Sequence, residues 1–303
     1  MKDISIPRDW KSAAQVILEQ TGIVMAMGLP DSGKSTLSRY LVHHLTQANR
    51  VVAMIDCDVG QNHLGPPTTM GMAIYRRPCK QFDTIKPRYM RFIGATSPVG
   101  HIMEIVVATR KLTDKALGLG AEVVIVNTGG LILGALGAKL KLNQVDLVCP
   151  KYILALQESS EIEHLLIPLE KQRVSIIRLT VSQKAQKRTH EVRRRFREQR
   201  YRKYFRQSRV IRIPLSRVAM RGHVWDEGRD ATIGEEKNLL LGLCDSENYA
   251  LALGIFQKFN SKDHYLHILT PLSSHNLEKV RIVHLGDIRV YPTGQEEYIR
   301  GQN

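Results

Sequence analysis

The stretch Gly28-Leu-Pro-Asp-Ser-Gly-Lys-Ser35 matches the pattern G-x-x-x-x-G-K-[ST]. An apolar run precedes it over residues 22–27, and residues 37–45 carry apolar side chains at helical spacing. A phosphate-binding P-loop requires this order of strand, loop and helix, because its glycines let backbone N–H groups point at phosphate oxygens beside a helix N-terminus. The alternative is a turn rich in Gly, Pro and Ser before an unrelated helix. We predict a nucleotide site at this loop.

Individual side chains of the loop have separate expected roles. Lys34 can reach the β- and γ-phosphates and is the first predicted catalytic residue. The hydroxyl of Ser35 is an expected Mg²⁺ ligand. The residues expected to bind the nucleotide are Gly28, Asp31, Ser32, Gly33, Lys34, Ser35 and Thr36.

A second apolar run, residues 51–55, ends in the acidic stretch Asp56-Cys-Asp-Val-Gly-Gln61. Alternation along an extended strand predicts that Asp56 and Asp58 share one face. In a P-loop fold this strand end lies beside the phosphate loop, on the carboxyl side of the sheet. A carboxylate there can hold Mg²⁺ or accept a proton from an attacking hydroxyl. The alternative is a pair of solvated acids in a turn.

The pattern of expected secondary structure changes near residue 209. Before it, expected strands at residues 91–94, 123–126, 153–156 and 174–179 and an expected helix at 102–119 predict an α/β fold with a parallel sheet covered on both faces. After it, strand-like runs cover residues 210–214, 238–243, 250–256, 265–270 and 280–290. We therefore predict a P-loop domain over residues 1–208 and a small β-rich domain over residues 209–303.

The charge is concentrated in one segment. The net charge is +15, and residues 184–212 hold 13 Lys or Arg against two acids. Such a block implies a polyanionic partner: nucleic acid, an anionic membrane or bound phosphates. Residues 183–205 lack Gly and Pro and predict one polar helix. We expect its aromatic side chains to serve as packing anchors, and the alternative is that they are platforms on which bases stack. These side chains are Phe196, Tyr201, Tyr204 and Phe205.

Composition excludes several classes of protein. Hydrophobic residues make up 43% of the chain, enough to build a core. No apolar run reaches the ~20 residues that cross a bilayer, and residues 1–15 lack the apolar segment of a secretory signal. Four widely spaced cysteines without a C-x-x-C pair argue against a disulfide framework or zinc knuckle. These features predict a cytoplasmic protein without a membrane partner.

Four segments together resemble the polynucleotide 5′-hydroxyl kinases, the P-loop RNA kinases of tRNA splicing, pre-mRNA 3′-end cleavage and ribosomal RNA processing. Residues 56–69 (DCDVGQNHLGPPTT) resemble the family segment D-x-D-x-G-Q…P-P-x-T. Residues 94–98 (GATSP) and 126–130 (VNTGG) resemble its G-x-T-S-P and N-T-x-G segments, and residues 188–205 its arginine-rich lid. The resemblance extends weakly into residues 242–256, which are similar to the ribosomal-RNA-processing branch.

The resemblance implies an ATP- and Mg²⁺-dependent kinase that phosphorylates the 5′-OH end of RNA, or also of DNA. It implies that Asp58 is the general base and that Arg188 and Arg193, in a lid helix over residues 183–206, close over the transferring phosphoryl group. The implied metal-organising residues are Ser35, Asp56, Gln61 and Thr96. The implied substrate-binding residues are Gln61, Thr96, Thr128, Gly129 and Arg197.

Two departures and two competing functions accompany the resemblance. Leu131 stands where the family often has a Trp that stacks on a base, and the P-loop begins at residue 28, which predicts a compact form. The competing functions are a non-catalytic ATP-binding adapter in an RNA-processing complex and an NTPase switch. Joint retention of Lys34, Asp58, Arg188 and Arg193 argues against the adapter. Protein partners are left open. Arg194, Arg195, Arg200, Arg202 and Lys203 are expected to contact the RNA backbone or to be solvated.

Overall fold

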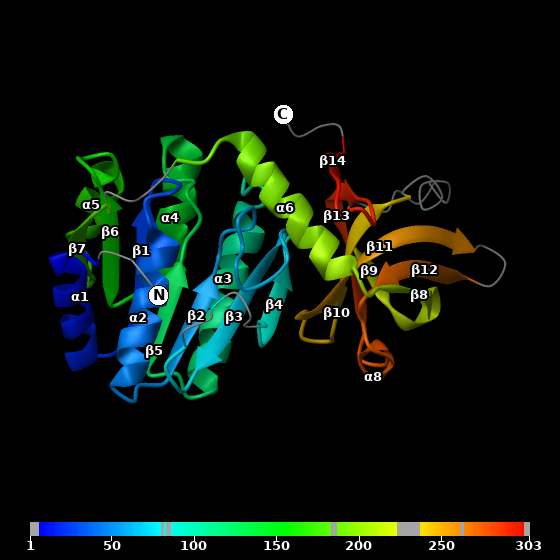
Figure 1. Cartoon of the computed structure of the whole chain (residues 1–303), viewed down its shortest axis with the longest axis horizontal. Coiled ribbons are helices and arrows are strands. Elements are labelled where there is room, and N and C mark those ends of the chain that lie inside the picture. Colours follow the sequence, from blue (N-terminus) through cyan, green and yellow to red (C-terminus); the bar gives the residue numbers. More distant parts are fainter. Residues whose placement is uncertain are drawn as a thin grey trace.

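The computed structural model describes residues 6–79, 82, 86–182, 187–222, 237–260 and 264–299. Two β-sheets lie side by side, and the long helix α6 (His190–Phe205) runs from the carboxyl edge of the first sheet to the second sheet (Figure 1). No helix among the described residues is long and apolar enough to span a membrane.

The first sheet has seven strands in the order β4-β3-β2-β5-β1-β6-β7. The strands are β1 (Ile23–Gly28), β2 (Val52–Asp56), β3 (Thr69–Tyr75), β4 (Tyr89–Phe92), β5 (Val123–Asn127), β6 (Tyr152–Gln157) and β7 (Ser175–Thr180). Strands β1, β2, β5, β6 and β7 pair in parallel, whereas β3 and β4 are antiparallel. The parallel sheet expected from the sequence therefore forms its main part, and an antiparallel edge is added where β3 follows β2 through a loop and not through a crossover helix.

Helices cover both faces of this sheet, as predicted, and build two hydrophobic cores. On one face α1 (Arg8–Glu19) and α2 (Lys34–Gln47) pack with Val24 of β1. On the other face α3 (Ile102–Gly118), α4 (Gly134–Val148) and α5 (Glu163–Leu169) pack with Met25 of the same strand. Neighbouring strand residues face opposite layers because side chains alternate along a strand. Helices α1, α4 and α5 were not predicted from the sequence.

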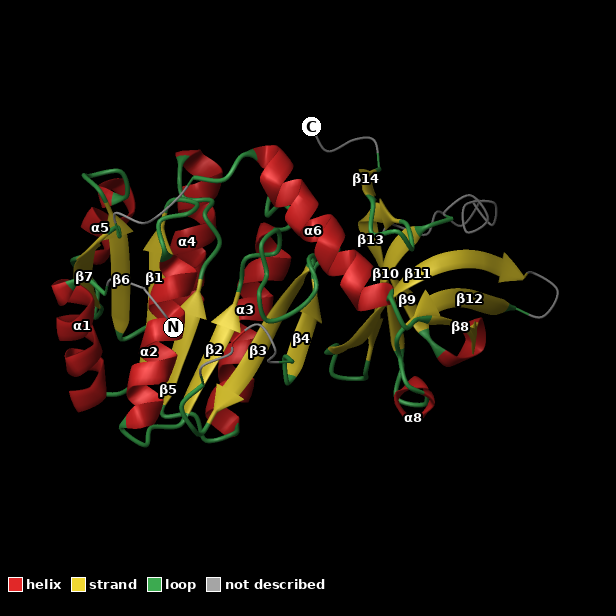
Figure 2. Cartoon of the chain, viewed as in Figure 1, coloured by secondary structure: helices red, strands yellow, loops and turns green. Residues whose placement is uncertain are grey.

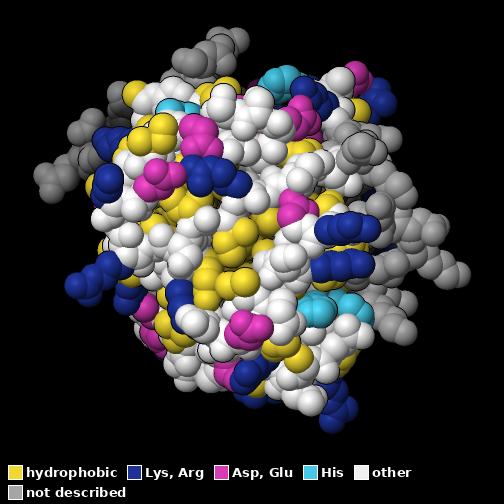
Figure 3. All heavy atoms as spheres, turned by 90° about the vertical axis from the view of Figure 1, so that its left-hand side faces the viewer, with side chains coloured by type: hydrophobic (Ala, Val, Ile, Leu, Met, Phe, Trp, Pro, Cys, Tyr) yellow, Lys and Arg dark blue, Asp and Glu magenta, His cyan; other side chains and the backbone are white. Residues whose placement is uncertain are grey.

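The edge strand β7 forms one end of the molecule. Viewed from that side, hydrophobic side chains gather in the middle of the surface and charged ones lie around them (Figure 3). Arg178 of β7 forms ion pairs with Glu163 (2.8 Å) and Glu170 (2.6 Å). A charged side chain on an edge strand discourages pairing with another chain.

The second sheet is antiparallel, apart from the parallel pair β9–β13 (Figure 2). Its strands are β8 (Arg209–Pro214), β9 (Ala219–Arg221), β10 (Leu239–Cys244), β11 (Ala250–Asn260), β12 (Tyr265–Thr270), β13 (Ile282–Val290) and β14 (Glu296–Tyr298), with the short helices η2 (Leu215–Arg217) and α8 (Ser274–Leu277). All five runs expected after residue 209 form strands. The domain boundary at residue 208 stays a prediction, although the first strand of this sheet begins one residue later.

Helix α6 begins at His190, where Thr189 caps it by accepting a hydrogen bond from the backbone N–H of Val192. The expected helix over residues 183–206 therefore starts too early: residues 187–189 are not helical, and residues 183–186 lie outside the described part of the chain. Tyr201 and Phe205 are buried in a core shared with β4, β10 and β11, which confirms their role as packing anchors. This packing joins α6 to both sheets.

Candidate active site

A cavity of about 1590 Å³ opens where β1, β2 and β5 end. The phosphate loop, the acidic loop after β2, the segment after β5, the start of α6 and strand β14 line its walls. Every predicted site residue lines this cavity except Gly28, Ser32 and Asp56. Gly28 and Asp56 are the last residues of β1 and β2, and Ser32 lies in the phosphate loop. The segment at residues 96–98 after β4 lines the cavity as well, so the chain brings residues from distant segments to one place.

The phosphate loop needs glycine at its two ends. A Cβ atom at Gly28 would lie 2.6 Å from the carbonyl oxygen of Leu156 in β6, so no larger residue fits. Gly33 caps α2 at a φ of 95°, a left-handed conformation that side chains disfavour. The loop therefore turns sharply and presents the N-terminus of α2 to the cavity, as phosphate binding requires.

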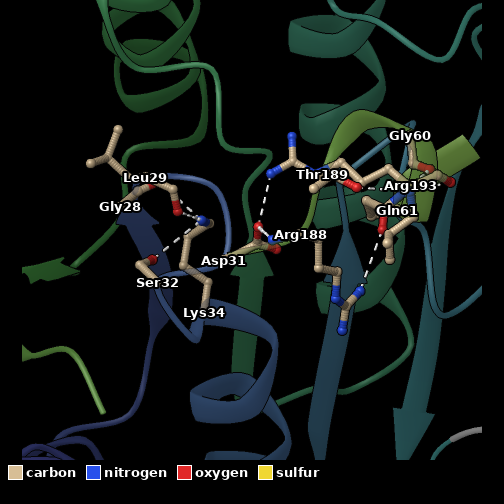
Figure 4. Close-up of polar contacts among 11 residues, drawn as sticks. Gly28, Leu29, Asp31, Ser32, Lys34, Gly60, Gln61, Arg188, Thr189 and Arg193 are labelled. Atoms are coloured by element: carbon tan, nitrogen blue, oxygen red, sulfur yellow. Dashed lines mark hydrogen bonds and ion pairs between the residues drawn. The ribbon is translucent and has the colours of Figure 1, made fainter. Parts of the chain in front are cut away.

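Lys34 folds back onto its own loop. Its Nζ donates hydrogen bonds to the carbonyls of Gly28 (2.9 Å) and Leu29 (2.6 Å), and Ser32 Oγ lies 3.5 Å away (Figure 4). The side chain is 6% exposed, and burial lowers the pKa of its ammonium to about 8. The amine therefore stays mostly protonated at pH 7 and can exchange these carbonyls for phosphate oxygens.

Asp56, Asn127 and Ser35 form a polar group in which Ser35 lines the cavity and the other two residues are buried behind it. Asn127 Nδ2 donates to both Ser35 Oγ and Asp56 Oδ1, each at 3.1 Å. Asp56 is 0% exposed, and burial together with the charge of Asp58 raises its pKa to about 7. This excludes the solvated-acid alternative for Asp56. No role was predicted for Asn127 from the sequence, although it belongs to the segment at residues 126–130 that resembles N-T-x-G. The register of β2 and β5 places it opposite Asp56.

The Asp56 group fits a bound Mg²⁺. The buried Oδ1 of Asn127 has no hydrogen-bond partner, and the hydroxyl of Ser35 lies beside it. Mg²⁺ prefers oxygen ligands and commonly uses one or two carboxylates, waters and substrate phosphates. Within the described ranges no cluster of three or more His, Cys, Asp or Glu residues could hold a metal. An oxygen site completed by phosphates is therefore the arrangement that these residues suit.

Asp58 stands in a turn and not on the strand. Strand β2 ends at Asp56, so the alternation argument for a shared face was wrong. Asp58 Oδ1 accepts hydrogen bonds from the backbone N–H groups of Gly60 (3.1 Å) and Gln61 (2.9 Å), which fix the carboxylate at the cavity wall. The two acids thus have different environments, one buried beneath the cavity and one lining it.

The arginine-rich lid contacts both loops. Arg193 Nη2 lies 2.8 Å from Asp31 Oδ2 in an ion pair, and the backbone N–H of Arg188 donates to the same oxygen at 2.9 Å. Burial raises the pKa of Asp31, but these contacts from Arg188 and Arg193 outweigh it and lower the pKa overall. Gln61 bridges to the lid as well, since its amide contacts the Arg188 side chain and the carbonyl of Arg193, each at 3.4 Å (Figure 4).

Strand β14 of the second sheet also reaches the cavity. Glu296 is almost fully buried and forms an ion pair with Arg197 of α6, whose Nε lies 2.9 Å from Oε1. The hydroxyl of Tyr298 is hydrogen-bonded to Thr96 Oγ1. Gln61 and Thr96 therefore line the cavity on its lid and β14 sides, and their metal-organising roles stay predictions. Sequence reasoning missed Glu296 and Tyr298 because they carry no motif.

Most arginines expected to meet RNA have partners within the protein. Arg194 pairs with Glu198 and Arg195 with Glu191, both at i,i+4 spacing, so the two acids of the helix are both used. Arg200 donates to the carbonyls of His63 (3.3 Å) and Gly65 (2.6 Å). Arg202 donates to the carbonyl of Thr293 (2.8 Å). These partners give each arginine an intramolecular role, and their contact with the RNA backbone stays a prediction.

Lys141 is a buried amine that the sequence analysis overlooked. Its side chain is 0% exposed, and Nζ donates to the carbonyl of Gly129 at 2.8 Å. Burial, followed by repulsion from Lys34, lowers its pKa to about 7. The available signal was its helical spacing, since Lys141 falls among the buried positions of α4 with Leu140 and Gln144.

The segment after β5 fills the space between the two loops. A Cβ atom at Gly129 would lie 3.8 Å from Asp58 Cα, and one at Gly130 would lie 2.6 Å from a side-chain atom of Pro30 in the phosphate loop. Leu131 lines the cavity and is partly buried against the core. The bond from Lys141 to Gly129 therefore holds a segment that touches both loops.

The chain is similar in sequence to a known family of proteins. A model of the family described as mRNA cleavage and polyadenylation factor CLP1 P-loop matches residues 28–207, more than half of the chain. A polyribonucleotide 5′-hydroxyl-kinase of Methanocaldococcus jannaschii is 27% identical over 322 residues, covering 90% of this chain and 88% of that protein. A polyribonucleotide 5′-hydroxyl-kinase of Pyrococcus abyssi is 29% identical over 341 residues, covering 96% and 94%.

The fold also matches a solved structure. The Clp1p–Pcf11p complex contains a chain that superimposes with a TM-score of 0.67 at 12% identity, covering 92% of this chain and 77% of that chain. At this identity the match concerns the fold alone. Because the match covers 92% of this chain, and each sheet is built from a smaller part of the chain, it includes residues of both sheets.

Proposed function

The chain belongs to the CLP1 P-loop family, and on this basis we propose that it is an ATP-dependent polyribonucleotide 5′-hydroxyl kinase. It transfers the γ-phosphate of ATP to the 5′-OH end of RNA. One observation carries the proposal: the phosphate loop with Lys34, the acidic loop with Asp58 and the lid with Arg193 line a single cavity. Phosphoryl transfer needs positioning and charge neutralisation above all, and these three elements supply both.

The nucleotide end of the cavity is formed by the phosphate loop. Backbone N–H groups at the start of α2 bind the phosphates, and Lys34 moves from the carbonyls of Gly28 and Leu29 to the β/γ oxygens. Ser35 and Asp56 would hold Mg²⁺, which when bound neutralises the phosphate oxygens. Burial and the charge of Asp58 raise the pKa of Asp56 to about 7, so a cation bound beside this carboxylate would offset the cost of its charge.

The acceptor end is formed by Asp58. Its Oδ1 is held by the turn, which leaves Oδ2 to accept the proton of the 5′-hydroxyl. The hydroxyl oxygen forms the new bond to the γ-phosphorus while the bond from that phosphorus to the β–γ bridging oxygen breaks, and ADP leaves.

The lid neutralises the transferring group. Arg193 exchanges Asp31 for the equatorial oxygens of the γ-phosphate, and Arg188 approaches from its place beside Gln61. Guanidinium groups suit this task because they donate several hydrogen bonds in a fixed plane. Closing the lid also excludes water, which limits ATP hydrolysis.

Labelled transfer tests the function directly. Purified protein is incubated with γ-labelled ATP, Mg²⁺ and oligonucleotides of RNA or DNA that carry either a 5′-OH or a 5′-phosphate. Label on 5′-OH RNA alone or on both 5′-OH acceptors supports the kinase. Phosphate release without any oligonucleotide supports the NTPase switch, and ATP binding without transfer or release supports the adapter. We also propose a cytoplasmic location, which the four free cysteines support.

A further inference from the structure

The cavity offers very little aromatic surface for an RNA acceptor. Proteins that hold single-stranded nucleic acid commonly stack its bases on aromatic rings, which works for every base. Among the described residues lining the cavity, Tyr298 is the only Phe, Tyr or Trp. It comes from β14 in the second sheet, and its side chain is 47% exposed. An exposed ring inside a catalytic cavity is available to a ligand.

Tyr298 is connected through a few contacts to Asp58, the predicted general base. Its hydroxyl is hydrogen-bonded to Thr96 Oγ1. The backbone of Thr96 packs against Gly60, where a Cβ atom would lie 2.7 Å from the Thr96 carbonyl oxygen and 3.7 Å from Asp58 Oδ1. One residue, Thr96, therefore separates the phenol from the turn that carries Asp58. A 5′-hydroxyl at Asp58 places the attached sugar and base in this neighbourhood.

The strand that carries Tyr298 is fixed before any ligand binds. Tyr298 pairs with Ile288 of β13, and the buried pair of Glu296 with Arg197 ties β14 to the lid helix. Strand β13 is in turn connected to the segment that follows β4 of the first sheet. The backbone N–H of Asp287 donates to the carbonyl of Gly94 at 2.9 Å, and the carboxylate of Asp287 lies 2.7 Å from His101 Nε2. A ring held in place loses little conformational freedom when a base stacks on it.

We infer that Tyr298 is the surface on which the base of the acceptor's 5′-terminal nucleotide stacks, while its hydroxyl positions Thr96. This inference rests on the proposed kinase function and gives the second sheet a part in substrate binding. The platform acts on any base, because a phenol face discriminates weakly between them. Tyr298 thus supplies an aromatic ring in a cavity where position 131 is leucine.

Two substitutions separate the ring from the hydroxyl. Tyr298→Leu removes the ring, and Tyr298→Phe keeps it but removes the bond to Thr96. Tyr291→Leu is the matched control, since Tyr291 lies on the same β13–β14 hairpin, outside the cavity lining, with its hydroxyl on Glu297. Equal melting temperatures for the Tyr298→Leu and Tyr291→Leu proteins would establish that the hairpin remains folded.

Kinetics on an intact RNA and on the same RNA lacking its 5′-terminal base measure the stacking. Stacking of one base changes affinity by about 5- to 150-fold. The wild type and Tyr291→Leu should lose this factor in kcat/KM when the base is absent, mainly through KM. Tyr298→Leu should lose it on intact RNA and lose nothing further on the abasic RNA. Tyr298→Phe should keep the KM and lose kcat. A Tyr298→Leu enzyme that is still as sensitive to base removal as the wild type overturns the inference.

A binding measurement decides the matter without turnover. RNA with 2-aminopurine at its 5′-terminal position should lose fluorescence on binding to the wild type and to Tyr298→Phe, because stacking quenches this base. Unchanged fluorescence on the bound wild-type protein overturns the inference even if the variants do not fold. Quenching in a protein that transfers no phosphate would instead support the platform and overturn the kinase proposal, so the two failures are distinguishable.

Discussion

Arg193 of the lid helix and Asp31 of the phosphate loop form an ion pair, with Nη2 and Oδ2 2.8 Å apart. Asp31 has a left-handed backbone conformation, with a φ of 62°, and its carboxylate accepts a hydrogen bond from the lid. The arginine expected to neutralise the transferring phosphoryl group is therefore held by the protein's own carboxylate. The lid is already docked on the loop, and the γ-phosphate competes with Asp31 for this guanidinium.

We expect Arg193→Ala to lower kcat far more than it raises the KM for RNA. An arginine aimed at the transferring phosphoryl group contributes on the order of 10³–10⁵ in rate. Arg195→Ala is the control, because Arg195 is on the exposed side of the same helix and pairs with Glu191. Steady-state kinetics at varied RNA concentration separate the two parameters. A pure KM effect for Arg193→Ala would assign this residue to RNA binding.

Lys34→Ala and Asp58→Asn should both abolish transfer, but by different routes. Lys34 contacts phosphates, so its loss should weaken ATP binding as well as turnover. Asp58→Asn should bind ATP nearly normally, because the amide still accepts the hydrogen bonds of the turn but cannot take a proton. General bases contribute about 10²–10⁴ in rate. Titration with a fluorescent ATP analogue, alongside the transfer assay, tests this; near-normal transfer by Asp58→Asn would refute the base assignment.

Lys141 should make stability rise with pH above neutrality. Its pKa is lowered to about 7, so between pH 7 and the ordinary lysine value of about 10 the unfolded chain binds a proton that the folded chain has released. The free energy of unfolding should therefore increase by about 1.4 kcal/mol per pH unit from this group. Urea unfolding at pH 7.5, 8.5 and 9.5 gives the free energy of unfolding of the wild type and of Lys141→Met. In the difference between the two proteins, the contributions of the other titrating groups cancel. A difference that does not change with pH would show that the amine titrates normally.

Lys141 should also affect the reaction through Gly129. Loss of its hydrogen bond frees the segment that touches Asp58 and Pro30. We therefore expect Lys141→Met to lower kcat about tenfold, the order expected for one hydrogen bond, while the KM for ATP stays within a factor of a few. Lys141→Arg, which keeps a donor at this position, should recover part of the rate. Equal kcat values for the wild type and Lys141→Met would restrict this residue to stability.

Arg200→Ala should cost stability and leave the salt dependence of RNA binding unchanged. Charge alone predicts that arginines of this helix contact phosphates, in which case each contact would change the slope of log binding constant against log salt by about 0.7. The structure instead engages Arg200 with the carbonyls of His63 and Gly65. Hydrogen bonds from a charged group contribute about 1.5–3 kcal/mol. Unfolding curves and salt titrations with a fluorescent 5′-OH oligonucleotide measure both effects; a shallower slope would restore Arg200 to the RNA path.

The local motifs were predictable because contiguous residues determine them. The spacing of Gly28, Gly33 and Lys34 by itself indicates a turn that begins a helix. The acidic loop follows a strand that the apolar run at residues 51–55 indicates. The strands of the second sheet were predictable for the same reason, since apolar runs alternate there with turn residues. These inferences need only neighbours in the chain.

The remaining site residues were decided by the tertiary structure. Asn127 contacts Asp56 because β5 pairs with β2 in a particular register. Tyr298 contacts Thr96, from which it is separated by 202 residues in the chain, because the second sheet packs against the first. Lys141 is buried at the site because α4 packs beside the segment after β5, where the amine donates to the carbonyl of Gly129. Contacts between distant residues depend on how layers pack, and the composition of either segment alone does not specify that packing. The sequence by itself therefore determined the chemistry of the loops, whereas sheet register and packing decided which side chains complete the site.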